Sequence, residues 1–171
     1  ALADLNLGAD DTLVYASCYA ESRALEGFLD SFPTPSPTLF QISIHPSAVH
    51  QALIHRQQAV RHFFPHTGRT SLVAQSVLTA LFAPTPRAIL CGGEERGAWL
   101  LDHQVASGRS FAFALLLTSD ATRAAGKISI EACEETSAYE ILLPEFFDAL
   151  RTRRALDIVA MPKLRLTLDW S

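Results

Sequence analysis

The feature that most constrains the fold is an almost unbroken apolar run over residues 110–118 (SFAFALLLT). A strand of this composition is typically covered on both faces, as in α/β proteins, because neither face offers polar side chains to water. Two shorter apolar runs, residues 12–17 (TLVYAS) and 87–91 (RAILC), predict further buried strands. We therefore expect an α/β or mixed fold that is built around a largely buried sheet.

The rest of the sequence predicts further helices and strands, with interruptions at prolines and glycines such as Pro65 and Gly68. Apolar residues at helical spacing, or a proline suited to a first turn, predict helices at residues 19–31, 46–62, 75–82 and 144–154. Short apolar or alternating segments predict strands at residues 70–74, 127–133 and 164–170. Residues 39–44 are predicted to be a strand or an extended approach to a helix. We expect strands 110–118 and 127–133 to form an antiparallel pair.

The composition describes one domain of 171 residues with a full hydrophobic core, since 49% of the residues are hydrophobic and 19% are charged. The formal net charge of −4 argues against a nucleic-acid-binding protein, because such domains are usually strongly basic. No apolar run reaches about 18 residues, so we expect no transmembrane helix. The cysteines, Cys18, Cys91 and Cys133, are odd in number and widely spaced, which favours reduced thiols in a cytoplasmic protein.

Most of the histidines lie between His45 and His66, and this cluster suggests a metal-binding enzyme as one alternative. On one helix, however, His50 and His55 would project in directions roughly 140° apart. His55 and His62 would share a face but lie about 10 Å apart along it, which is too far for one ion. We therefore expect no metal site and no other cofactor, and we interpret the cluster as a polar helix face.

Cys18 follows a predicted buried strand and precedes a predicted helix, at a turn where a helix N-terminus can stabilise a thiolate. A second alternative is therefore an acyl-transferring enzyme that uses Cys18, or a serine such as Ser71 or Ser76, as its nucleophile. A general base would still be required, and the sequence does not place one beside Cys18. The default interpretation of Cys18 is a small packed residue.

The order of several short motifs resembles β-ketoacyl synthases, and in particular their divergent aryl-polyene and chain-length-factor-like branch. Residues 15–21 (YASCYAE) resemble the "FASRYGE" strand exit of that branch, and residues 43–48 (SIHPSA) resemble its "S-x-H-N-A" segment. Residues 69–81 and 87–95 look like the nucleophile region of ketosynthases and the strand that follows it, and residues 110–136 resemble the ketosynthase hairpin. The resemblance is strongest over residues 12–136.

The resemblance implies that residues 1–171 form a single ketosynthase-like domain, a half of the thiolase-like fold. Such a half is a layered α/β/α domain with a mixed sheet of about five strands. The second half, with the catalytic histidines of the family, is absent, and residues 139–171 have no counterpart. Ketosynthases dimerise through the strand before the nucleophile, which would be residues 70–74 here. The implied partners are a second copy or a ketosynthase, together with an acyl carrier protein or an acyl-thioester.

The sequence departs from the family at the nucleophile. Where ketosynthases carry the cysteine that accepts the acyl chain, this chain reads LVAQS, and Gln75 lies near the equivalent position. Chain-length factors carry glutamine in place of this cysteine, and an amide cannot form the thioester. The resemblance thus implies a non-catalytic subunit of fatty-acid or polyketide synthesis, of the aryl-polyene type, that shapes or holds an acyl chain. Its candidate acyl- or partner-binding residues are His45, Ser47, Thr70 and Ser71.

Overall fold

The computed structural model describes residues 7–120, 122 and 124–171. Its larger sheet has four strands in the order β2-β1-β3-β4, which span His62–Thr67, Thr12–Ser17, Arg87–Glu94 and Phe111–Thr118. β1 is parallel to both of its neighbours, whereas β4 is antiparallel to β3. The smaller sheet is antiparallel and contains, in spatial order, β5 (Gly126–Ala132), β7 (Leu164–Trp170) and β6 (Leu156–Met161).

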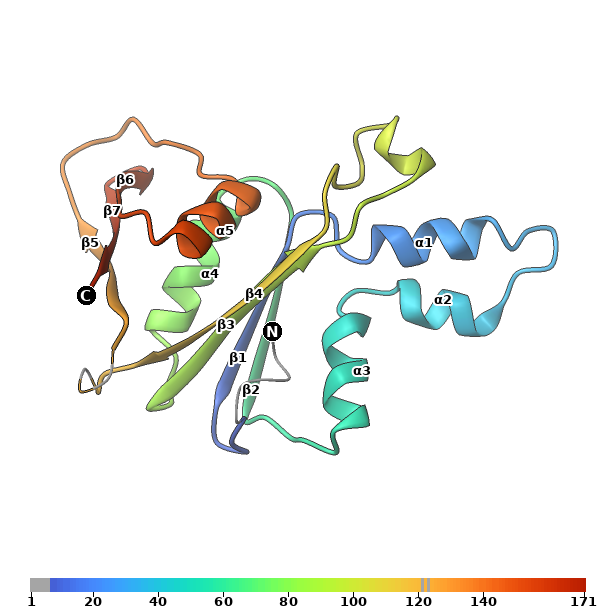
Figure 1. Cartoon of the computed structure of the whole chain (residues 1–171), viewed down its shortest axis with the longest axis horizontal. Coiled ribbons are helices and arrows are strands. Elements are labelled where there is room, and N and C mark those ends of the chain that lie inside the picture. The colour runs from blue at the N-terminus through green and yellow to red at the C-terminus, as the bar shows by residue number, and fades with distance from the viewer. Residues whose placement is uncertain (1–6, 121, 123) are drawn as a thin grey trace.

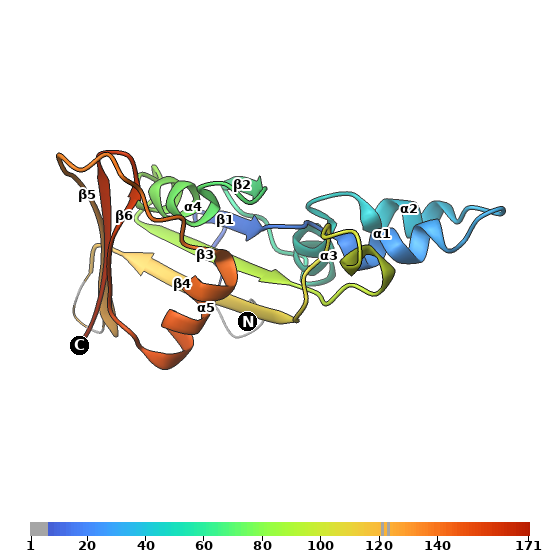
Figure 2. The ribbon, with the colours of Figure 1, turned by 90° about the horizontal axis from the view of Figure 1, so that it is seen from above.

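The sheets and helices form successive layers (Figure 1). α4 (Leu72–Leu81) and α5 (Leu143–Thr152) lie between the two sheets, and α3 (Ser47–His55) covers the opposite face of the larger sheet. α1 (Ser22–Leu29) and α2 (Pro37–Ser43) extend away on the side of α3, as Figure 2 also shows. The predicted layered, mixed α/β architecture is confirmed. The larger sheet has four strands, and a second, smaller sheet accompanies it.

Each face of the larger sheet packs against its own apolar cluster, because side chains alternate along the strands. On one face, Val14 of β1 packs in a cluster that includes Val77 of α4 and Phe146 of α5. On the other face, Leu13 of β1 packs with Val49 of α3. Since α4 is composed almost entirely of small and apolar residues (LVAQSVLTAL), it can occupy the buried middle layer.

The structure corrects the predictions at the edge of the larger sheet. The predicted strand 70–74 is wrong, because these residues form the turn before α4 and the start of α4 itself. The strand lies earlier, as β2, and the predicted helix 46–62 is therefore shorter and ends at His55. Pro65 does not interrupt the chain, because β2 is an edge strand, where a residue without an N–H is tolerated.

Two further predictions differ from the structure. Residues 39–43 lie in helix α2 rather than in a strand, because Ser36 and Pro37 provide a helix start: the Ser36 hydroxyl accepts a hydrogen bond from the Leu39 N–H at 3.3 Å. β4 and β5 do not pair with each other, since β4 pairs with β3 and β5 pairs with β7 in the smaller sheet. The connection between them includes Ala121 and Arg123, which lie outside the described residues.

Candidate functional site

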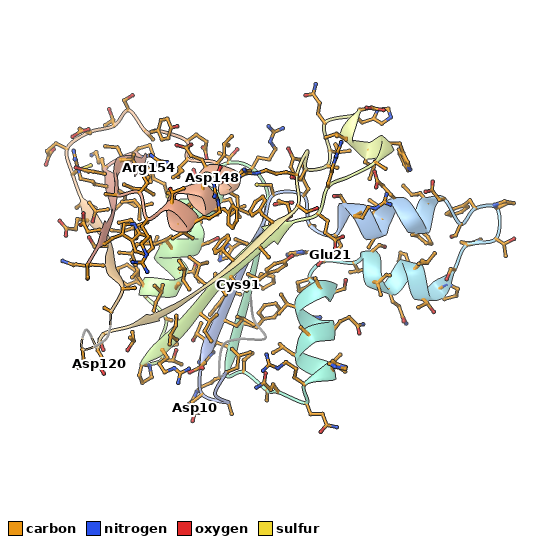
Figure 3. All side chains as sticks on the ribbon, viewed as in Figure 1. Asp10, Glu21, Cys91, Asp120, Asp148 and Arg154 are labelled. Atoms are coloured by element: carbon orange, nitrogen blue, oxygen red, sulfur yellow. The ribbon has the colours of Figure 1, made fainter. Side chains whose placement is uncertain are left out.

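The carboxyl ends of the parallel strands β1, β2 and β3 lie at the same edge of the larger sheet as the N-terminal ends of α1 and α4. Ligands of open α/β sheets bind outside the carboxyl ends of the strands. Three groups of polar side chains lie in this region, centred on Glu94, His45 and Ser71. Figure 3 shows the side chains on the ribbon and labels Glu21, which belongs to the second group.

The first group connects the ends of β1 and β3. Glu94 is the last residue of β3 and is only 5% exposed. Its carboxylate accepts hydrogen bonds from the Cys18 N–H and from the Ser17 hydroxyl, which lies 3.3 Å from both carboxylate oxygens. Burial raises the pKa of Glu94, and the hydrogen bonds from Cys18 and Ser17 oppose that rise. The hydrogen bonds to Glu94 therefore hold the end of β1 in place, although burial disfavours the ionised form of this carboxylate.

The two glycines before Glu94 allow β3 to reach this position. A Cβ on Gly92 would lie 2.7 Å from the carbonyl oxygen of Ala16, and a Cβ on Gly93 would lie 2.5 Å from that of Phe111. Both distances are shorter than side-chain contacts permit, so only glycine fits between the neighbouring strands. The segment CGGE is thus a tight strand exit.

Cys18 lies beside Glu94 but lacks the environment of a nucleophile. Burial, followed by the negative charge of Glu94, raises the pKa of the Cys18 thiol to about 11. The thiol is therefore protonated at neutral pH, and a protonated thiol is a poor nucleophile. Cys91 is buried in β3, and burial raises its pKa to about 12.

The second group consists of a carboxylate, an imidazole and a phenol. One oxygen of Glu21, Oε2, lies 3.0 Å from His45 Nδ1, and the other, Oε1, accepts a hydrogen bond from the Ala48 N–H at 3.2 Å. The His45 ring stacks on the Tyr15 ring, with 5.4 Å between their centroids. Burial and the charge of Glu21 raise the pKa of Tyr15, which keeps the phenol neutral. The His45 Nε2 atom is buried and has no hydrogen-bond partner among the described residues.

The third group lies at the N-terminus of α4. Ser71 precedes the helix with φ = 54°, in the left-handed region, so β2, a tight turn and α4 follow one another directly. The Ser71 N–H donates a hydrogen bond to Glu140 Oε1 at 2.6 Å. A carboxylate is a favourable partner at a helix N-terminus, where unpaired N–H groups and the helix dipole attract negative charge. Glu140 comes from the irregular segment before α5.

The remaining candidates from the sequence lie in or near these groups. Thr70 is exposed in the turn before Ser71, and Gln75 is exposed on α4, one turn inside the helix. Ser76 is buried on α4, and its hydroxyl has no partner among the described residues. The Ser47 hydroxyl donates to the Ile42 carbonyl and so connects the end of α2 to α3.

The histidines between His45 and His66 do not converge on one point. His50 packs against Phe63 with ring centroids 5.3 Å apart, whereas His66 Nε2 lies 3.1 Å from the Thr79 hydroxyl of α4. Within residues 7–120, 122 and 124–171, no group of three or more His, Cys, Asp or Glu side chains could hold a metal ion. The geometry of these residues therefore gives no support to the metal-binding alternative.

The three carboxylates that organise these groups were not among the residues predicted from the sequence. Glu94 follows a recognisable pattern, two glycines at the end of a buried strand, and Glu21 ends the "FASRYGE"-like motif. Either pattern could have indicated a buried acid. Glu140 lies outside any motif, and nothing in the sequence connects it with Ser71, 69 positions earlier.

Comparison with known proteins identifies the fold. No protein-family model and no curated protein sequence matches the chain. A solved structure, the ketosynthase ApeO in complex with its chain length factor ApeC from Xenorhabdus doucetiae, matches with a TM-score of 0.63. The match has 20% sequence identity and covers 94% of this chain and 69% of the matched chain. The predicted thiolase-like fold is therefore confirmed. No helix in the described part of the chain is long and apolar enough to cross a membrane.

Proposed function

We propose that this chain is a non-catalytic, chain-length-factor-like subunit that pairs with a ketosynthase and helps to shape or hold an acyl chain. The setting is fatty-acid or polyketide synthesis of the aryl-polyene type, with acyl groups delivered as thioesters on an acyl carrier protein. The observation that carries the proposal is the N-terminus of α4. The strand, turn and helix that would present a nucleophile are there, but they carry Ser71 and no thiol.

Three features of the site support a non-catalytic role. The Ser71 N–H is already occupied by Glu140, so this amide is not free to hold the carbonyl oxygen of an acyl group. Gln75, one turn further along α4, also offers no thiol. Cys18, beside Glu94, has a pKa that is raised to about 11, which leaves little thiolate at neutral pH.

The candidate binding residues also fit this proposal. His45 has a buried Nε2 atom without a partner among the described residues, and Glu21 holds the ring by its Nδ1 atom. Thr70 and Ser71 lie in the turn between the edge strand β2 and α4, where a partner chain at this edge would be close to them. The ketosynthase partner is inferred by analogy with the ApeO and ApeC complex.

The decisive experiment incubates the purified chain with acyl carrier protein thioesters and measures its intact mass. We expect no acyl adduct on the wild-type chain, since no activated thiolate is present. A stoichiometric adduct that is lost in Cys18→Ala, Ser71→Ala or Ser76→Ala would contradict the non-catalytic role and identify the nucleophile. Co-expression with a tagged ketosynthase from the same genome tests the partner, and failure to co-purify would contradict the pairing.

A further inference from the structure

β2 is the edge strand of the larger sheet, and its hydrogen bonds define which backbone groups face outward. The Gly68 N–H, just after β2, donates to the Ser17 carbonyl at 3.3 Å, in a register that places Ser17 opposite Thr67. The backbone groups of a strand alternate between its two sides, so the even-numbered residues of β2 bond to β1. Phe63, Pro65 and Thr67 therefore direct their backbone groups toward the open edge, the side of β2 that pairs with no strand of the described residues.

Pro65 lies at the centre of this open edge. Phe63 and Thr67 keep an N–H donor on either side of it, but Pro65 has none, and its ring occupies the space into which the hydrogen would point. The hydrogen bonds between β2 and β1 are undisturbed, because Pro65 lies opposite Tyr15 at a position that donates no bond to β1. The proline thus removes one backbone N–H donor from the side of β2 that another strand could pair with, and it changes nothing else in the sheet.

A second copy of the chain would form fewer backbone hydrogen bonds with this edge than a different chain would. Two identical strands pair antiparallel about a two-fold axis, and the longest such pairing sets Phe63 against the second copy's Thr67. Pro65 then faces the second copy's Pro65, so two backbone hydrogen bonds are lost at the centre and two proline rings meet. A strand without proline at that position loses only one bond.

We propose that Pro65 disfavours pairing of β2 with a second copy of this chain and so reserves the open edge for a strand of a different polypeptide. The proposal rests on the proposed function, in which that polypeptide is a ketosynthase. The proline then acts as a specificity device, because it weakens the competing self-pair more than the intended pair.

The experiment compares the self-association of the wild-type chain and Pro65→Val by sedimentation velocity over a range of concentrations. Each backbone hydrogen bond contributes about a fivefold change in affinity, so Pro65→Val should tighten the self-association constant about 25-fold. The same substitution should tighten binding to a tagged ketosynthase from the same genome only about fivefold. Pro84→Val, at an exposed proline outside the strands, is the matched control and should change neither constant.

The outcomes separate this proposal from the proposed function. Unchanged self-association of a folded Pro65→Val variant, as judged by circular dichroism, would overturn the role of Pro65. A wild-type homodimer that is lost in Thr67→Pro would also overturn it, since that substitution removes an outward N–H and leaves the bonds to β1 in place. Absence of any ketosynthase binding would instead contradict the proposed function, while the self-association of the isolated chain still tests Pro65.

Discussion

Glu94 and Cys18 lie at the carboxyl ends of neighbouring strands, and the carboxylate contributes to the raised pKa of the thiol. The Cys18 N–H and the Ser17 hydroxyl both donate to Glu94, so the negative charge is held beside the sulfur. Burial comes first among the causes that raise the pKa of Cys18 to about 11, and the charge of Glu94 comes second. The ionisation of Cys18 therefore tests directly whether this residue is a packed thiol or a latent nucleophile.

We predict that alkylation of Cys18 by iodoacetamide is slow at neutral pH and accelerates with a midpoint near pH 11, as the thiol ionises. Glu94→Gln should lower this midpoint, because it removes a negative charge next to the thiolate while it keeps an oxygen for the Cys18 N–H. The rate is measured by peptide mass spectrometry across the pH range, with the half-buried Cys133 as an internal reference. A midpoint at or below 9.0, the value of an ordinary thiol, would contradict the assignment.

The residues of the site could be predicted from the sequence only in part. Cys18 and His45 are found because they lie in short motifs next to predicted strand and helix ends. Their partners are harder to find, since Glu94 meets Ser17 across 77 positions and does so only because β1 and β3 pair in parallel. The sequence does not specify which strands are neighbours, so the carboxylates of the site follow from the topology.

At the scale of elements, one carboxylate from α1 holds the long connection between β3 and β4. Glu26 is fully buried, and its Oε1 atom accepts hydrogen bonds from the N–H groups of Ala98 and Leu100 at 2.7 and 2.8 Å. Arg23, one turn earlier on α1, forms an ion pair with Glu26 Oε2 at 2.8 Å. Glu26 therefore supplies the acceptor for backbone donors at the start of the 3-10 helix η2 (Trp99–Leu101).

Removal of this carboxylate should release the connection while the sheets remain folded. Glu26→Ala leaves the Ala98 and Leu100 N–H groups without their acceptor, so we expect faster amide hydrogen exchange over residues 96–105. Glu26→Gln retains one oxygen acceptor and should have a smaller effect. Arg23→Ala removes only a half-exposed partner and serves as the control. Unchanged exchange in Glu26→Ala would show that the connection is held by other contacts.

The elements with the clearest patterns are those that the sequence predicts best. β1, β3, β4, β5 and β7 lie within three residues of their predicted positions at each end, because continuous or alternating apolar residues define them. α5 lies as close to its prediction, because Pro144 marks its first turn. β2 is the informative failure. Its sequence, HFFPHT, mixes histidine, proline and aromatic residues, and it forms a strand only because β1 offers a paired edge. Tertiary context thus decides where local propensity is ambiguous.

The C-terminal segment, residues 139–171, completes the core. The expectation that it has no counterpart is wrong, because the match to the solved structure covers 94% of the chain and so extends into this segment. Phe146 of α5 is 1% exposed and packs edge-to-face on Phe113 of β4, with 5.8 Å between the ring centroids. Leu166 and Leu168 of β7 belong to the same apolar cluster as Val77 of α4. The smaller sheet and the larger sheet therefore share one core through the middle layer of helices.

This shared core predicts that both ends of the molecule unfold together. The two tryptophans report on opposite sides: Trp99 lies beside α1, where its indole N–H donates to Asp30, and Trp170 ends β7, where its indole N–H donates to the Arg154 carbonyl. In urea, the fluorescence of Trp99 in a Trp170→Phe variant should follow that variant's circular dichroism transition. Likewise, the fluorescence of Trp170 in a Trp99→Phe variant should follow the circular dichroism transition of that variant. The reason is that a two-state domain gives coincident transitions by every probe. An earlier transition of Trp170 alone would show that the smaller sheet unfolds as a separate unit, which its common cluster with α4 argues against.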